Sequence, residues 1–225
     1  MKIKPPSVAG KFYTNDKDEL LSQFDFFAQN STKFCHFNSR AIIVPHAGYT
    51  YSGQLAYNAF QYLDNKVKNI FVIAPSHYMA FEGLALLNCD KWATPLGEID
   101  INKKMNEELI NKFYYCSYQD EAYQSEHSIE VQIPFIQKFV PNAKIIPILM
   151  GKIDYSRISR IIAQYWEDTD NAFVISSDLS HFLKTDEARK IDAQTARMIE
   201  EGDLEEFEFD QACGFNGVCA LTQFV

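Results

Sequence analysis

Four residues whose side chains could carry chemistry follow apolar stretches of the sequence. They are His46, His77, Asp178 and His181. Imidazole and carboxylate groups bind divalent transition metals and transfer protons near neutral pH. Two histidines with one anionic ligand leave open coordination positions, as non-haem iron and catalytic zinc require. The pattern therefore favours a metal or proton-transfer site over the alternative of hydrogen-bonded structural histidines.

His127 is a fifth candidate, within the segment Glu126–His127–Ser128–Ile129–Glu130. Apolar residues from Ile129 onward have helical spacing, which predicts a helix over 126–140 that opens on this segment. Pro134 should kink that helix or mark its true start. In such a helix Glu126 and Glu130 share one face. His127 is then a proton relay or a partner that orients a ligand, or alternatively an ordinary helix end.

Cys213, followed by Gly214, is the sixth candidate. A thiolate is a soft metal ligand, and it is a nucleophile when its pKa is depressed. Spacing alone does not separate this role from that of a small buried apolar residue. The remaining histidine and cysteines show no partner pattern, and we interpret them as structural or surface residues. They are Cys35, His36, Cys89 and Cys116, whereas Cys219 lies six residues after Cys213, outside the spacing at which two helical residues touch.

The elements that must position these residues alternate along the chain. Continuously apolar runs predict strands covered on both faces of a parallel sheet, at 41–45, 69–75, 144–150 and 172–177. Amphipathic spacing predicts helices over 52–64, 102–113, 155–166 and 186–201, the last with Thr185 as N-cap and Gly202 as its stop. The fold class is therefore α/β, one domain with a mostly parallel central sheet flanked by helices.

Ligands of open α/β sheets bind at the carboxyl ends of the strands, where the candidate residues lie. His46 and His77 are 31 residues apart, the length of one βαβ unit, which predicts that their strands are neighbours.

Composition excludes several functions. The chain has 225 residues and a formal net charge of −9, without the basic stripe that a general nucleic-acid binder or an anionic-membrane binder needs. No apolar stretch is long enough to span a membrane, and no signal peptide is evident. Five cysteines without a CxxC pair favour free thiols in a reducing cytoplasm. The sequence has no GxGxxG, P-loop or GxSxG pattern.

The motifs together resemble the Memo family, also called the AmmeMemoRadiSam system protein B family, over nearly the whole chain. Six ordered motifs carry the resemblance. They are Val8–Tyr13, Pro45–Tyr49 with Tyr51–Gly53, Ala74–Tyr78, Glu126–Gln132, Ser176–His181 and Cys213–Gly214.

This resemblance implies a fold similar to the class III extradiol dioxygenases, which use non-haem iron. It implies that His46, His77 and Cys213 bind a metal and that Asp178 and His181 line the cleft. Cysteine replaces the glutamate of those enzymes, which argues against ring cleavage and suits iron, copper or zinc. The family also implies phosphotyrosine peptides as ligands, and radical-SAM and AMMECR-type proteins as partners.

The resemblance also implies a helix and a final strand after Cys213–Gly214. The sequence stops at Val225, eleven residues after Gly214. We therefore expect a single Memo-like domain over residues 1–225 that lacks its C-terminal end.

Three functions remain open at this stage. The first is a metal-dependent oxidoreductase-like enzyme in which His46, His77 and Cys213 bind the metal, while Asp178, His181 or His127 moves protons or orients a small-molecule substrate. The second is a module that binds a peptide or protein in the same cleft. The third is a metal-dependent hydrolase with Asp178 as the base.

Overall fold

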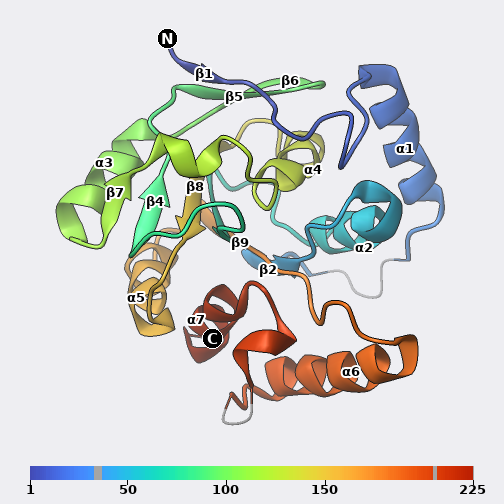
Figure 1. Cartoon of the computed structure of the whole chain (residues 1–225). Coiled ribbons are helices and arrows are strands. Elements are labelled where there is room, and N and C mark those ends of the chain that lie inside the picture. The colour runs from blue at the N-terminus through green and yellow to red at the C-terminus, as the bar shows by residue number, and fades with distance from the viewer. Residues whose placement is uncertain (33–36, 205–206, 225) are drawn as a thin grey trace.

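The four predicted strands are neighbours in a six-stranded sheet in the computed structural model, which describes residues 1–32, 37–204 and 207–224 (Figure 1). The order across the sheet is β2 (Ala41–Val44), β9 (Asn171–Ser176), β3 (Asn69–Pro75), β8 (Lys144–Met150), β4 (Leu84–Leu86) and β7 (Cys116–Tyr118). The first four strands are parallel, as predicted, while β4 runs antiparallel to β8. The sheet is therefore mixed, and its parallel centre confirms the α/β assignment.

The prediction that the strands before His46 and His77 are neighbours is wrong. Strand β9 lies between β2 and β3, and its Ile175 pairs with Ile43 on one side and Ile73 on the other. Every residue of β9 is buried, which suits a central position better than an edge. The carboxyl ends of β2, β9 and β3 still meet at one edge of the sheet, because all three strands are parallel.

Helices cover both faces of this sheet (Figure 1). Helices α1 (Lys17–Gln29), α2 (Tyr49–Phe60) and α4 (Ile133–Phe139) pack on the face that carries Ile70 and Val72. Helices α3 (Lys103–Lys112), α5 (Tyr155–Trp166), α6 (Thr185–Glu201) and α7 (Phe215–Phe224) pack on the face of Phe71 and Ile73. Consecutive β3 residues belong to opposite clusters, which explains why this strand is continuously apolar.

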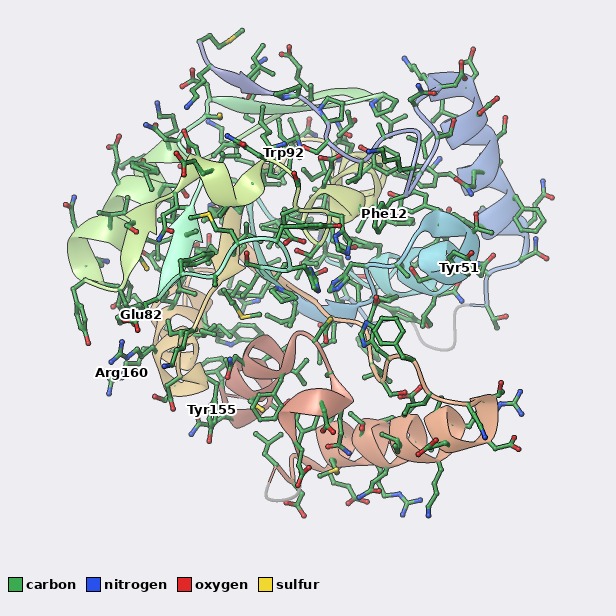
Figure 2. The ribbon with its side chains drawn as sticks, in the orientation of Figure 1. Phe12, Tyr51, Glu82, Trp92, Tyr155 and Arg160 are labelled. Atoms are coloured by element: carbon green, nitrogen blue, oxygen red, sulfur yellow. The ribbon has the colours of Figure 1, made fainter. Side chains whose placement is uncertain are left out.

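A second, three-stranded sheet lies over the first face and was not predicted from the sequence. It consists of β1 (Ile3–Lys4), β5 (Lys91–Thr94) and β6 (Gly97–Asp100), in the order β1-β5-β6. Trp92 of β5 is fully buried, with its ring centroid 5.9 Å from that of Tyr123 (Figure 2). The strands are too short for a clear apolar pattern, so their residues gave no signal.

Helix boundaries agree with the sequence where the apolar stripe is long. The predicted helices at 102–113, 155–166 and 186–201 correspond to α3, α5 and α6, and α2 begins at Tyr49 rather than at Ser52. Gly202 ends α6 in the left-handed conformation with φ of 71°, as expected of a helix stop. Thr185 is the first helical residue and not the N-cap. Lys184 occupies the cap position and makes no side-chain cap bond there.

The predicted helix over 126–140 is shorter than expected. A 3-10 turn at Glu130–Gln132 precedes α4, which begins at Ile133. Pro134 therefore marks the start of the helix, one of the two outcomes anticipated, because a proline in the first turn removes no intrahelical hydrogen bond.

None of the helices within the described residues is long and apolar enough to span a membrane. Cys89, Cys116, Cys213 and Cys219 are free thiols. Cys35 and His36, which were predicted to be structural or surface residues, lie outside the described residues.

Candidate metal centre

His46 follows β2 by two residues, and its side chain is 1% exposed. Its backbone N–H donates to Asp178 Oδ1 at 2.7 Å, and its Nδ1 lies 2.9 Å from Ser176 Oγ. Ser176 Oγ already gives its proton to the carbonyl oxygen of Ser128 and accepts from the Gln132 amide. It can therefore only accept from His46, so Nδ1 carries a proton and Nε2 is the ring nitrogen that faces Cys213.

His77 follows β3 by two residues and is held in a similar way. Its Nδ1 lies 2.9 Å from Glu126 Oε1, and its backbone N–H donates to Glu126 Oε2 at 2.5 Å. A buried carboxylate accepts the Nδ1 proton, so Nε2 is the ring nitrogen that faces the cleft, and it can bind a metal once its own proton is lost. Metal-binding histidines usually have this arrangement, in which one ring N–H donates a hydrogen bond to a carboxylate and the other ring nitrogen faces the metal.

Glu126 and Glu130 do not share a helix face, so that prediction is wrong. The Glu126 carboxylate also accepts the backbone N–H groups of His127 and Ser128, which holds 126–128 in an irregular turn. Glu130 points elsewhere and accepts from the N-terminal segment that contains Val8 and Tyr13. Each carboxylate is buried and satisfied by backbone N–H donors, and this competes with helix formation.

His127 lies between aromatic rings at the wall of the cleft. Its ring stacks on Phe12 with centroids 4.4 Å apart and on His77 with centroids 4.8 Å apart. Its Nδ1 is 3.3 Å from Glu126 Oε1 but has no hydrogen-bond partner among the described residues. One ring nitrogen from each of His46, His77 and His127 lies within 4.8 Å of the others, which makes them a candidate metal-binding group.

Cys213 reaches the same point from the loop before α7. Its Sγ lies 3.2 Å from His46 Nε2 and accepts the backbone N–H of Asp178 at 3.2 Å. Gly214 makes this approach possible, because a Cβ there would lie 2.5 Å from Ser177 Cβ. The three residues predicted as metal ligands, His46, His77 and Cys213, are therefore brought together.

Asp178 and His181 lie at the rim of this group. Asp178 Oδ2 is 3.9 Å from His46 Nε2 and 3.9 Å from His181 Nε2. The His181 side chain is 40% exposed and lines a separate hollow beside α6. Of the residues predicted to move protons or orient substrate, His127 and Asp178 lie against the histidines, and His181 contacts the group only through Asp178.

The side chains perturb one another's pKa values strongly. Burial alone would raise the pKa of Cys213, but hydrogen bonds with His46 and His77 outweigh it and lower the pKa to about 6. Burial alone would lower the pKa of His77, but bonds with Cys213 and Glu126 raise it to about 9. Burial lowers the pKa of His127 to about 4. Cys213 is therefore a thiolate beside a protonated His77 at neutral pH when no metal is bound.

This donor set fits a transition metal. It offers the Cys213 thiolate and the Nε2 atoms of His46 and His77. The Nδ1 atoms of these two histidines are hydrogen-bonded to Ser176 and Glu126. Such mixed sulfur and nitrogen sites suit iron, copper and zinc. The sequence did not reveal Ser176, Glu126 or Phe12 as partners of the histidines, although all three fall within the motifs that carry the family resemblance.

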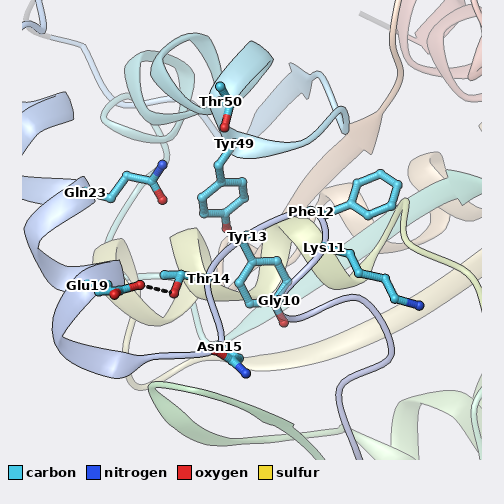
Figure 3. A pocket seen from close by; sticks show the side chains of 10 residues that line it. All are labelled: Gly10, Lys11, Phe12, Tyr13, Thr14, Asn15, Glu19, Gln23, Tyr49 and Thr50. Carbon is cyan, nitrogen blue, oxygen red and sulfur yellow. Dashed lines mark hydrogen bonds between the residues drawn. The ribbon is translucent and has the colours of Figure 1, made fainter.

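Two hollows lie near this group. One is a cavity of about 520 Å³ bounded by His77 and Cys213. The other, of about 500 Å³, lies between the N-terminal segment and helices α1 and α2, with Tyr13 and Tyr49 at its centre and a hydrogen bond from Thr14 to Glu19 (Figure 3). The first hollow alone is lined by the proposed metal ligands.

Comparison with known sequences identifies the family. The family model described as Memo-like protein matches residues 4–220, a range that holds every candidate residue. The chain belongs to the Memo family. Its single α/β domain with a mixed sheet is the class III extradiol dioxygenase-like architecture of Memo proteins.

Memo relatives come from all three domains of life. A MEMO1 family protein of Aquifex aeolicus (strain VF5) is 33% identical over 213 residues, covering 93% of this chain and 79% of the relative. The MEMO1 family protein Ta0237 of Thermoplasma acidophilum is 34% identical, covering 100% of this chain and 86% of the relative. The protein memo-1 homolog of Caenorhabditis elegans is 38% identical, covering 78% of this chain and 52% of the relative.

Proposed function

We propose that the cleft binds one metal ion through His46 Nε2, His77 Nε2 and Cys213 Sγ, and that it supports redox chemistry on a small organic molecule. The observation that carries the proposal is the orientation of the two imidazoles. The Nδ1–H group of each imidazole donates a hydrogen bond to a buried acceptor, Ser176 or Glu126, and its Nε2 atom faces the Cys213 thiolate. Iron or copper suits this function best, and zinc suits the same ligands.

A bound iron or copper ion would supply one-electron chemistry and open coordination positions. The chain's own residues then position the substrate and its protons. His127 is neutral at physiological pH, because burial lowers its pKa to about 4, so it can orient a substrate by hydrogen bonding or relay a proton without holding a charge. Asp178 Oδ2 faces both His46 and His181, which suits a proton path from the cleft to solvent.

Metal content after anaerobic purification tests the binding step. We expect stoichiometric iron or copper in the wild-type protein and its loss in H46A, H77A and C213S. The matched control is H181A, which should keep the metal because His181 lies at the rim. A metal-free wild type, or C213S with unchanged metal content, contradicts the proposal.

H127A separates two ligand sets. If His46, His77 and Cys213 bind the metal, H127A keeps it. If the three histidines bind it instead, H127A loses it and C213S does not. The same variants test the peptide-binding alternative, because partner binding that survives H46A and H77A does not require a metal. The radical-SAM and AMMECR-type partners and the cytoplasmic location stay predictions.

A further inference from the structure

The cavity beside the proposed metal ligands is lined mostly by apolar residues. Its volume of about 520 Å³ falls in the range of small-molecule sites. His77 and Cys213 form part of its wall. The other lining residues are mostly apolar and come from three segments distant in sequence. The apolar members include Phe81, Met150 and Ile153, and the polar members include Lys152 and Asn216.

The walls of this cavity are joined by backbone hydrogen bonds. Lys152 N–H donates to the Phe81 carbonyl oxygen at 2.7 Å, and Gly151 N–H donates to the Gly83 carbonyl oxygen at 3.0 Å. A Cβ on Gly151 would lie 2.2 Å from the Phe81 oxygen, so glycine lets the two segments meet. The cavity is therefore preformed, which lowers the entropic cost of filling it.

Two polar side chains in the cavity are available to a ligand. The Lys152 ammonium and the Asn216 amide have no hydrogen-bond or ion-pair partner within the part of the chain that the structure describes. Ser76, by contrast, donates its hydroxyl to the Met79 carbonyl oxygen. The positive charge of Lys152 beside an apolar surface can attract an anion locally, although the chain as a whole has a net charge of −9.

We propose that this cavity binds a small organic anion with an apolar body. The apolar body packs on Phe81, Met150 and Ile153, and the anionic group lies at Lys152 and Asn216. The same molecule reaches His77 and Cys213, so this assignment of a substrate class rests on the proposed metal-dependent function. The binding site itself requires no metal, because its walls are formed by the chain alone.

A panel of matched ligand pairs tests the proposal. The probes are 3-phenylpropionate, 4-phenylbutyrate and 2-naphthoate, each paired with the corresponding alcohol, and binding is followed by NMR titration of the full chain. We expect the carboxylates to bind more tightly than the alcohols. K152M should weaken the carboxylates about two- to fivefold, as for a solvent-exposed ion pair, and leave the alcohols unchanged. K152E should weaken the carboxylates further.

A second substitution fills the cavity. Ala80 is exposed at the cavity wall, so A80W should fold and should remove binding of every probe. The matched controls are K66M and A163W, which change exposed residues that do not line the cavity. Binding that A80W does not alter, equal weakening of acids and alcohols by K152M, or no binding by any member of the panel overturns the proposal.

Metal analysis keeps the two proposals separate. The titrations are done on chelator-treated protein and repeated on metal-loaded protein. Probe binding without metal in either preparation supports the cavity and contradicts only the metal site. Stoichiometric metal with no probe binding contradicts only the organic-anion assignment.

Discussion

At the scale of single residues, the two imidazoles are oriented by unlike partners that serve the same purpose. Ser176 is a hydroxyl whose only proton is already donated, and Glu126 is a carboxylate with no proton to give. Each can only accept the Nδ1 proton of its histidine, and so turns Nε2 toward the cleft. The orientation of the proposed ligands therefore depends on residues that do not touch the metal position.

E126Q tests this dependence. Glutamine keeps the shape of Glu126, but it replaces one carboxylate oxygen with an NH₂ group. That group is a donor, and it would face backbone N–H groups that are donors too. We expect metal affinity to fall about 10- to 100-fold, measured by competition with a chromophoric chelator. The control is E107Q, an exposed residue on α3, which should leave affinity unchanged. Wild-type affinity in E126Q would show that Glu126 has no orienting role.

Cys213 should be the most reactive of the described cysteines in metal-free protein. Its pKa is lowered to about 6, while burial raises the pKa of Cys116 and Cys219 to about 12. The rate of iodoacetamide labelling at Cys213, followed by peptide mass spectrometry, should rise through pH 6 and then level off, because the thiolate reacts. Added metal should slow the labelling. A rate that rises only near pH 9 would mean that Cys213 is an ordinary thiol.

At the scale of elements, hydrogen bonds to Glu130 hold the N-terminal segment, residues 7–13, against the rest of the domain. Its buried carboxylate accepts the backbone N–H groups of Ser7 and Val8 and the hydroxyl of Tyr13. The same segment carries Phe12, which stacks on His127. A carboxylate outside the proposed metal ligands therefore holds one wall of the cleft in place.

E130Q should destabilise the fold by about 1–3 kcal/mol, because it turns one buried acceptor into a donor that faces other donors. Urea denaturation measures the loss, and hydrogen exchange should show faster exchange in residues 7–13. E98Q is the control, since Glu98 is a surface residue paired with Lys91 and its loss should change stability by less than about 0.5 kcal/mol. Unchanged exchange at 7–13 in E130Q would mean that the segment is held by other contacts.

The sequence predicted the elements whose pattern is dictated by burial on both sides. The runs at Ile70–Ala74 and Ile145–Met150 have one physical explanation, a central parallel strand. It did not predict that β9 separates β2 from β3, because strand order depends on packing between distant segments. It extended the helix back to residue 126, because the sequence did not show that the Glu126 carboxylate accepts hydrogen bonds from the backbone of His77, His127 and Ser128. Residue types at strand ends did indicate which side chains would gather, since parallel strands end at one edge.

At the scale of the whole molecule, four groups of the cleft govern how the stability of metal-free protein varies with pH. The pKa of Glu126 falls from 4.5 to about 2 and that of His127 from 6.5 to about 4, so stability rises with pH from about 2 to 6.5. Above pH 6.5 the remaining two oppose each other. Folding raises the pKa of His77 from 6.5 to about 9, so the folded protein loses stability as the pH rises through this range. Folding lowers the pKa of Cys213 from 9.0 to about 6, so the folded protein gains stability over nearly the same range.

We therefore expect stability to rise up to about pH 6.5 and then stay level to about pH 9, measured as urea midpoints of chelator-treated protein across this range. C213S removes the gain above pH 6.5, while Glu126 still holds the pKa of His77 high. That variant should lose stability between pH 6.5 and pH 9. C89S is the control, because Cys89 lies outside the cleft and its pKa is raised rather than lowered. If C213S follows the wild-type profile, the thiolate and imidazolium do not form a pair in the folded protein.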